Sequence, residues 1–165
     1  MISRGANVNQ REKDGSRITA LHIAVMTGHM KVAKVLLDNG ADVNAGDDYG
    51  RTLLHIAANE QSEKLVEFLL KNGAKVNAED RGHWTPLHQA LKSQSDTKLE
   101  VVELLIRYGA DVNAKNPFGK SWDMGHDSSP FPRKPTPEGE TPLELAVNKG
   151  CIEIADLLRK SGARE

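Results

Sequence analysis

Apolar residues recur along this chain in paired blocks with helical spacing. The first block of each pair begins with Thr and reads TALHIAV (19–25), TLLHIAA (52–58), TPLHQAL (85–91) or TPLELAV (141–147). In the first three pairs the second block carries apolar residues eight, seven, five, four and three positions before a Gly. Such spacing gives a helix one broad apolar face. The pattern predicts pairs of short helices, with each Thr as an N-cap and each Gly at a helix end.

A further motif follows each helix pair and makes the chain a tandem repeat. Its copies are RGANVN (4–9), NGADVNA (39–45), NGAKVNA (72–78) and YGADVNA (108–114), with SGARE (161–165) as a truncated last copy. The step from the motif Asn to the next Thr is 8 or 10 residues, but it is 28 residues from Asn113 to Thr141. In every second block an apolar residue lies 8 residues before the Gly. Helix lengths are therefore constant, and the loops accommodate the insertions, including a shorter one within KSQSDTK (92–98).

A single helix pair cannot bury such an apolar face, so neighbouring pairs have to stack on one another. The predicted fold is an all-α solenoid of stacked helix-turn-helix units with hairpin loops. The last unit carries Arg159 where earlier units carry Leu37, Leu70 and Ile106, as expected of a polar terminal cap. Residues 1–9 match only the tail of a repeat, and we therefore expect this chain to be a fragment of a longer protein.

The motifs resemble the ankyrin repeat family, whose pattern is T-P-L-H-x-A-A, then G-H-x-x-V-V-x-L-L, then G-A-D-V-N-A, with a period of about 33 residues. The resemblance covers essentially the whole chain. It implies one array, divided into the tail of a preceding repeat (1–9), repeat 1 (10–45), repeat 2 (46–78), repeat 3 (79–114) and repeat 4 (115–165). Repeat 4 carries an inserted finger at about 120–138. The resemblance further implies a non-catalytic module that binds another protein.

Composition and charge narrow the possible partners. The formal net charge is −1 and no long run of Lys or Arg occurs, which argues against a nucleic-acid partner. No apolar stretch approaches the roughly 20 residues that a helix needs to cross a bilayer. Apolar residues make up 38% of the chain but aromatic residues only 4%, so the core must be built from aliphatic side chains. We expect a cytoplasmic monomer that does not insert into membranes.

The titratable residues give no coherent catalytic site. The T-P-L-H histidine recurs as His22, His55 and His88. For these the resemblance implies a structural role, with each ring bonded to the backbone of a neighbouring hairpin. Cys151, the single cysteine, is interpreted as an inert small side chain. We expect no enzyme activity, no catalytic residue, no metal site and no cofactor.

One weaker hypothesis is a metal site in the finger. Asp123, His126 and Asp127 could serve as ligands, because one imidazole and two carboxylates form a plausible ligand set. The surrounding sequence is rich in Gly and Pro and offers the ligands no rigid support, which disfavours this hypothesis.

The aromatic residues indicate where a partner would bind. Most of them fall in predicted hairpins or in the finger rather than in second helices, and aromatic side chains are enriched among the residues that dominate interface energetics. In the family that this chain resembles, hairpin tips and the exposed face of the first helices form a concave groove. The predicted partner-binding residues are Tyr49, Arg51, Arg81, His83, Trp84, Phe118, Lys120, Trp122, Phe131, Met26, Asn59, Glu60 and Lys92.

The finger is interpreted as an enlarged hairpin rather than a linker. Its prolines at 130, 132, 135 and 137 favour an extended backbone, which limits the entropy lost on docking. We hypothesise that it contributes Trp122, Phe131, Arg133 and Lys134 to a protein partner. The alternative is that Trp122 and Phe131 cover the backbone of the insertion itself.

Two other classes of function remain open at this level. The chain could be the targeting or regulatory part of a larger enzyme, or it could be a structural scaffold without a single groove partner. The sequence does not identify the partner.

Overall fold

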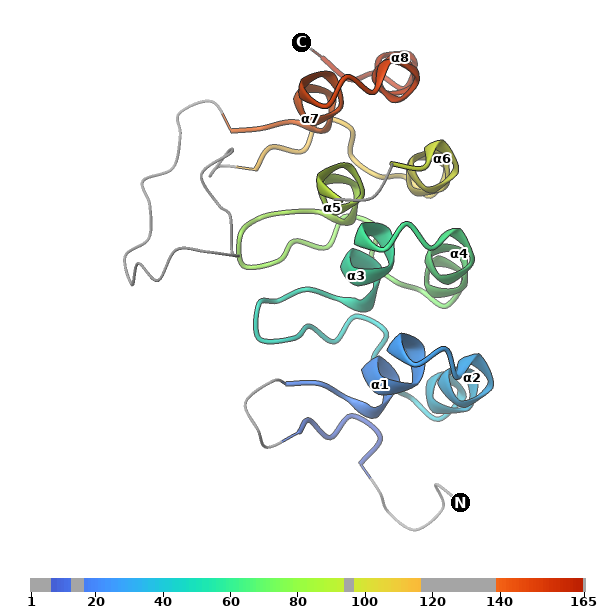
Figure 1. The fold of residues 1–165 in the computed structure, drawn as a ribbon. Coiled ribbons are helices and arrows are strands. Elements are labelled where there is room, and N and C mark those ends of the chain that lie inside the picture. Colours follow the sequence, from blue (N-terminus) through green and yellow to red (C-terminus); the bar gives the residue numbers. More distant parts are fainter. Residues whose placement is uncertain (1–6, 13–16, 94–96, 117–138, 165) are drawn as a thin grey trace.

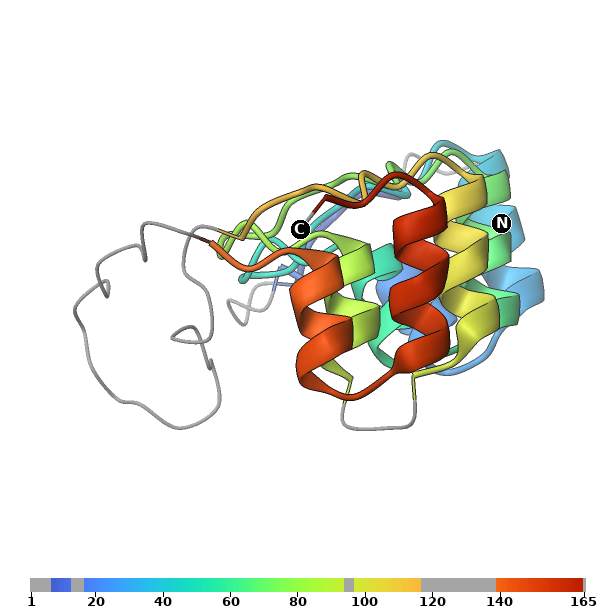
Figure 2. The same cartoon turned by 90° about the horizontal axis from the view of Figure 1, so that it is seen from above.

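The computed structural model describes residues 7–12, 17–93, 97–116 and 139–164. Within these ranges the helices follow one another in pairs. They are α1 (Ala20–Met26), α2 (Met30–Asp38), α3 (Leu53–Asn59), α4 (Glu63–Lys71), α5 (Pro86–Lys92), α6 (Leu99–Arg107), α7 (Pro142–Asn148) and α8 (Ile152–Lys160). The odd-numbered helices stack in one column and the even-numbered helices in a second (Figure 1). Figure 2, a view along the stack, shows the loops leaving on the side of the odd-numbered helices. The predicted all-α solenoid is confirmed.

Each first helix begins at a Thr N-cap, as predicted from the sequence. In α1, the Oγ1 atom of Thr19 accepts a hydrogen bond from the backbone N–H of His22, and the Thr19 N–H donates back to His22 Nδ1. In α7, Glu144 takes the place of the histidine and accepts the Thr141 N–H through Oε2 at 2.7 Å. The predicted N-caps Thr19, Thr52, Thr85 and Thr141 are all confirmed. Reciprocal caps of this kind satisfy two backbone groups that the first turn would otherwise leave unpaired.

The remaining terminus signals are also confirmed. Pro86 and Pro142 occupy the first position of α5 and α7, where the missing N–H costs nothing. The Gly that follows each second helix adopts a left-handed backbone, with φ of 88° at Gly109 and similar values in the other units. A left-handed residue directs the chain out of the helix into the next hairpin.

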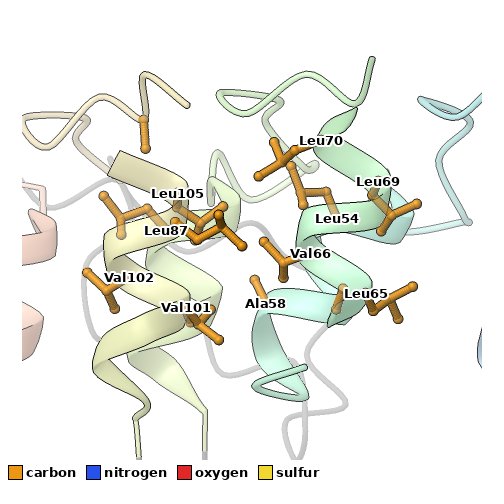
Figure 3. Close-up of a cluster of buried hydrophobic side chains, with 14 of the residues drawn as sticks. Leu54, Ala58, Leu65, Val66, Leu69, Leu70, Leu87, Val101, Val102 and Leu105 are labelled. Carbon is orange, nitrogen blue, oxygen red and sulfur yellow. The ribbon is translucent and has the colours of Figure 1, made fainter. Parts of the chain in front are cut away.

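The hydrophobic core runs continuously through the stack. Figure 3 shows its central part, in which side chains of α3 and α4 face those of α5 and α6. Leu54, Val66, Leu87 and Leu105 are all fully buried there. Small residues at the helix contacts, such as Ala58, leave room for this close approach. Each unit therefore buries its apolar face against the next, as the repeat requires.

The predicted apolar face is partly wrong for α2. Val32 and Val35 are 50% and 51% exposed, whereas Val101, which has the same place in the repeat as Val32, is fully buried. Helices α4, α6 and α8 each follow another second helix in the stack (Figure 1), but within the described residues no helix pair precedes α1 and α2. The first side of the stack is therefore uncovered.

A ladder of asparagine side chains joins successive units. The Nδ2 of Asn44 donates to the carbonyl of Gly73, and its Oδ1 accepts the N–H of Lys75 at 2.8 Å. Asn9, Asn77 and Asn113 make the same pair of bonds to the unit that follows them. The bonds of Asn113 reach Gly162 and Arg164, so the last unit stacks in register despite the insertion between them.

Candidate functional site

The second hairpin presents an aromatic side chain at its tip. Asp47 Oδ1 accepts hydrogen bonds from the N–H groups of Tyr49 and Arg51, which folds the loop around the carboxylate. The Arg51 guanidinium is paired with Asp47 at 2.8 Å and lies 5.0 Å from the centre of the Tyr49 ring. This stacking is a cation–π contact, and it holds a ring that remains 50% exposed. Tyr49 is therefore a positioned and accessible side chain.

The third hairpin is organised around a buried carboxylate. Asp80 is 5% exposed and its Oδ1 accepts from the N–H groups of Gly82 and Trp84. His83 adopts a left-handed backbone with φ of 59° and its exposed ring contacts Glu79 at 2.7 Å. Because these bonds fix the loop, the exposed side chain of His83 is held at the tip.

Hairpins two and three are directly joined. The N–H of Arg81 donates to the carbonyl of Tyr49 at 2.9 Å. Gly50, with φ of 76°, lies so close that a Cβ added there would be 3.1 Å from the Arg81 nitrogen. The exposed residues Tyr49, Arg81 and His83 thus belong to one connected hairpin edge rather than to independent loops.

Trp84 corrects the sequence-based prediction, because it is a core residue. Its side chain is only 3% exposed. The ring meets His88 edge to face at 5.6 Å, and the Lys92 ammonium lies 4.8 Å from its centre. Trp84 directly precedes the N-cap Thr85, where the chain turns inward to begin α5, so its ring packs into the stack instead of pointing outward. Lys92, also predicted as a contact, is half-buried and covers this ring.

The repeated histidines are structural, and two of the three make the predicted contact. Thr52 N–H donates to Nδ1 of His55, so the ring proton resides on Nε2, which donates to the carbonyl of Trp84 at 2.9 Å. His88 bonds to the carbonyl of Glu140 in the same way, at 3.2 Å. The Nε2 of His22 has no hydrogen-bond partner within the described residues.

Burial also sets the charge state of these rings. Desolvation lowers the pKa of His55 and of His88 below the ordinary value of 6.5. The hydrogen bonds from each ring to a backbone carbonyl raise the pKa, but desolvation is the larger effect. Desolvation lowers the pKa of His22 as well. The rings are consequently neutral at pH 7, as a structural donor–acceptor bridge requires.

The exposed face of the first helices contributes a second set of predicted residues. Met26 is 55% exposed at the end of α1, and Asn59 and Glu60 are exposed at the end of α3. Ile23 was not predicted, yet it is 45% exposed one helical turn before Met26. Residues three apart share a face of a helix, so Ile23 and Met26 form an exposed apolar pair. The sequence already showed that Ile23 and Met26 lie at fixed positions of the first helix in the repeat.

The comparisons with known proteins match this architecture. The description "Ankyrin repeats (3 copies)" fits residues 1–80 and 48–116, and "Ankyrin repeat" fits residues 138–164. The two together cover well over half of the chain. This chain belongs to the ankyrin repeat family. Ankyrin repeats are generally protein–protein interaction modules and are generally non-catalytic.

Two curated relatives share one segment with this ankyrin chain. They are the potassium channels named AKT1 of Oryza sativa subsp. indica and subsp. japonica, each 42% identical over 52 residues. That segment is 32% of this chain, but the match spans only 5% of the length of either channel. The match therefore covers only a small part of the length of these channels.

Several sequence-based predictions lie outside the described residues. These are the contact residues Phe118, Lys120, Trp122 and Phe131, the finger at about 120–138, and the metal hypothesis at Asp123, His126 and Asp127. Across the described part of the ankyrin array, no cluster of three His, Cys, Asp or Glu residues could hold a metal ion.

In the portion of the chain that the structure describes, none of the helices has both the length and the apolar character needed to cross a bilayer.

Proposed function

We propose that this ankyrin array is a non-catalytic module that binds a partner protein through its hairpin edge and the exposed face of its first helices. The observation that carries the proposal is the contrast between framework and surface. The same buried residues and backbone bonds recur in successive units, whereas the exposed positions carry different side chains. A fold that repeats while its surface varies is suited to selecting one partner.

The surface has the composition of an interface core. Ile23, Met26 and Tyr49 are exposed apolar side chains, each between 45% and 55% accessible. Tyr49 is already ordered by Arg51 and Asp47, so it loses little conformational freedom on binding. Aromatic anchors surrounded by polar residues are typical binding hot spots, and Arg81, His83, Asn59 and Glu60 are the polar residues here.

The finger remains part of the proposal on sequence grounds alone. Trp122 and Phe131 are large aromatic residues in a proline-rich insertion, a composition that favours docking with a small entropic cost. Deleting residues 121–137 tests their contribution. We expect weaker partner binding with unchanged thermal stability of the array, and equal affinity would exclude the finger as a contact.

The proposed function is tested by quantitative affinity capture followed by titration of the purified partner. The groove variant carries Met26→Ala and Tyr49→Ala. The matched control carries Lys34→Ala and Glu67→Ala, two exposed residues on second helices. We expect the groove variant to lose the partner and the control to retain it. Equal retention by both variants, or selective loss by the control, would contradict the proposal.

A second candidate is a regulatory segment within a larger protein, favoured by the partial match to the two potassium channels. In that case the partner would be another domain of the same protein. Titration with the neighbouring domain, expressed separately, distinguishes this candidate: saturable binding supports it, and absence of binding excludes it.

A further inference from the structure

A cavity of about 410 Å³ lies among the hairpin loops, outside the first-helix surface described above. Its lining residues come from three successive units, and none of them belongs to a helix. A volume of this size accommodates one or two side chains with their backbone, because ligand pockets begin at about 300 Å³.

The charge of this cavity is unbalanced. Its lining includes the cations Arg11, Arg17, Lys75 and Arg81 but only two carboxylates, those of Asp47 and Glu79. Asp47 forms an ion pair with Arg51, and Glu79 lies 2.7 Å from the His83 ring. By contrast, the structure gives the four cations no ion pair within its described ranges. In the lining of the cavity, cationic side chains therefore outnumber carboxylates by two.

The backbone at two of these cations, Lys75 and Arg81, is held by hydrogen bonds before any ligand arrives. The N–H of Lys75 is bonded to the Asn44 side chain, and the N–H of Arg81 to the carbonyl of Tyr49. Gly50 permits the close approach of the second and third hairpins. Because this backbone is already ordered, only the flexible ends of the side chains lose conformational freedom when a ligand binds, which lowers the entropic cost of binding.

We propose that this cavity binds the acidic side chains of a protein partner, as an Asp- or Glu-rich segment. Arginine and lysine donate strong charge-assisted hydrogen bonds to carboxylates. A nucleic acid is disfavoured, because it needs an extended basic stripe, whereas here the charge is confined to one compact cavity and the whole chain has a net charge of −1. This inference rests on the proposed function, and it specifies the chemistry of the partner.

The test is a titration of the full, isotopically labelled chain with an oligoglutamate peptide, followed by amide NMR. We expect saturable shifts at Gly46, Gly50 and Arg81, which weaken with added salt. An oligoglutamine peptide serves as the neutral probe and should leave the spectrum unchanged. Shifts spread over the whole surface, or no shifts, would overturn the assignment.

Two variants make the test specific. Lys75→Gln combined with Arg81→Gln should weaken oligoglutamate binding by about tenfold or more, since each lost bond to a charged group is a substantial part of the affinity. Lys31→Gln combined with Lys34→Gln removes two exposed charges from α2, outside the cavity, and should have no effect. Undiminished binding by the first variant, or equal losses in both, would overturn the assignment.

A third variant covers the case in which the first one fails to fold. Arg11→Gln combined with Arg17→Gln changes the two cations that the first hairpin contributes to the cavity and should weaken binding in the same way. Single-stranded DNA is the competing probe. Tighter binding of DNA than of oligoglutamate at equal charge would overturn the choice of a protein ligand.

Failure of this inference and failure of the proposed function give different results. If the partner is lost from the Met26 and Tyr49 variant but oligoglutamate does not bind, the cavity assignment fails and the proposed function stands. If oligoglutamate binds at the cavity but the Met26 and Tyr49 variant still captures the partner, the cavity assignment stands and the proposed function fails.

Discussion

Gln61 offers a quantitative test of how the loops of this array are held. Its side chain is 2% exposed, and its backbone is left-handed with φ of 54°. Nε2 donates to the carbonyl of Ala90 in α5 at 2.6 Å, and Oε1 accepts the N–H of Lys98, the N-cap of α6, at 2.9 Å. One carboxamide thus bridges both sides of the altered turn in the third unit.

Replacing Gln61 by Ala removes both bonds. The buried carbonyl of Ala90 then loses this bond, which costs about 1–3 kcal/mol, and the loss at the exposed Lys98 costs about 0.5–1.5 kcal/mol. We expect Gln61→Ala to lower the free energy of unfolding by about 2–4 kcal/mol. Gln61→Gly loses the same bonds but relieves a left-handed backbone by about 1 kcal/mol, so it should be the more stable of the two.

Urea unfolding followed by circular dichroism measures these differences. Gly28 occupies the equivalent turn of the first unit with φ of 75°, and a Cβ added there meets no atom within 4 Å. Gly28→Ala is therefore the control for the backbone effect alone, with an expected cost of about 1 kcal/mol. A Gln61→Ala variant as stable as the wild type, or a Gly variant less stable than the Ala variant, would refute this reasoning.

Three further predictions concern the framework. Because burial lowers the pKa of His55 below 6.5, the unfolded chain binds more protons in acid than the folded chain does. The free energy of unfolding should therefore fall as the pH drops below about 6.5, and denaturation curves of His55→Gln should show a weaker pH dependence. Trp84→Ala should lower the free energy of unfolding, measured by heat or urea, by about 3–5 kcal/mol, whereas Tyr49→Ala should lower it by less than about 1 kcal/mol. Equal losses at the two sites would show that Trp84 is a surface residue. Val32→Asp should be tolerated while Val101→Asp prevents folding, as judged by the circular dichroism of the purified variants; tolerance at both sites would contradict the stacked core.

The sequence alone predicted the helices because their signals are local. A Thr at each N-cap, Pro86 at a first position and a Gly after each second helix determine where helices begin and end. The spacing of apolar residues then requires stacking. These rules involve residues at most a few turns apart, so one sequence contains all the information they need.

The errors in prediction arise where distant contacts decide. Trp84 was expected at the surface because it lies in a hairpin, but its orientation depends on how α5 begins and on the covering Lys92. The bridging role of Gln61 depends on partners 29 and 37 residues away, which a single sequence does not pair. The uncovered Val32 depends on the absence of a preceding helix pair among the described residues, not on the local pattern.

The central claim is that the repeating framework is structural and that the hairpin edge, together with the first helices, recognises a partner protein. Hydrogen–deuterium exchange of the chain, with and without the purified partner, tests it most directly. We predict slower exchange on binding in the second and third hairpins and at the ends of α1 and α3, with unchanged exchange in α4 and α6. Protection confined to the second helices, with the hairpins unaffected, would contradict the account.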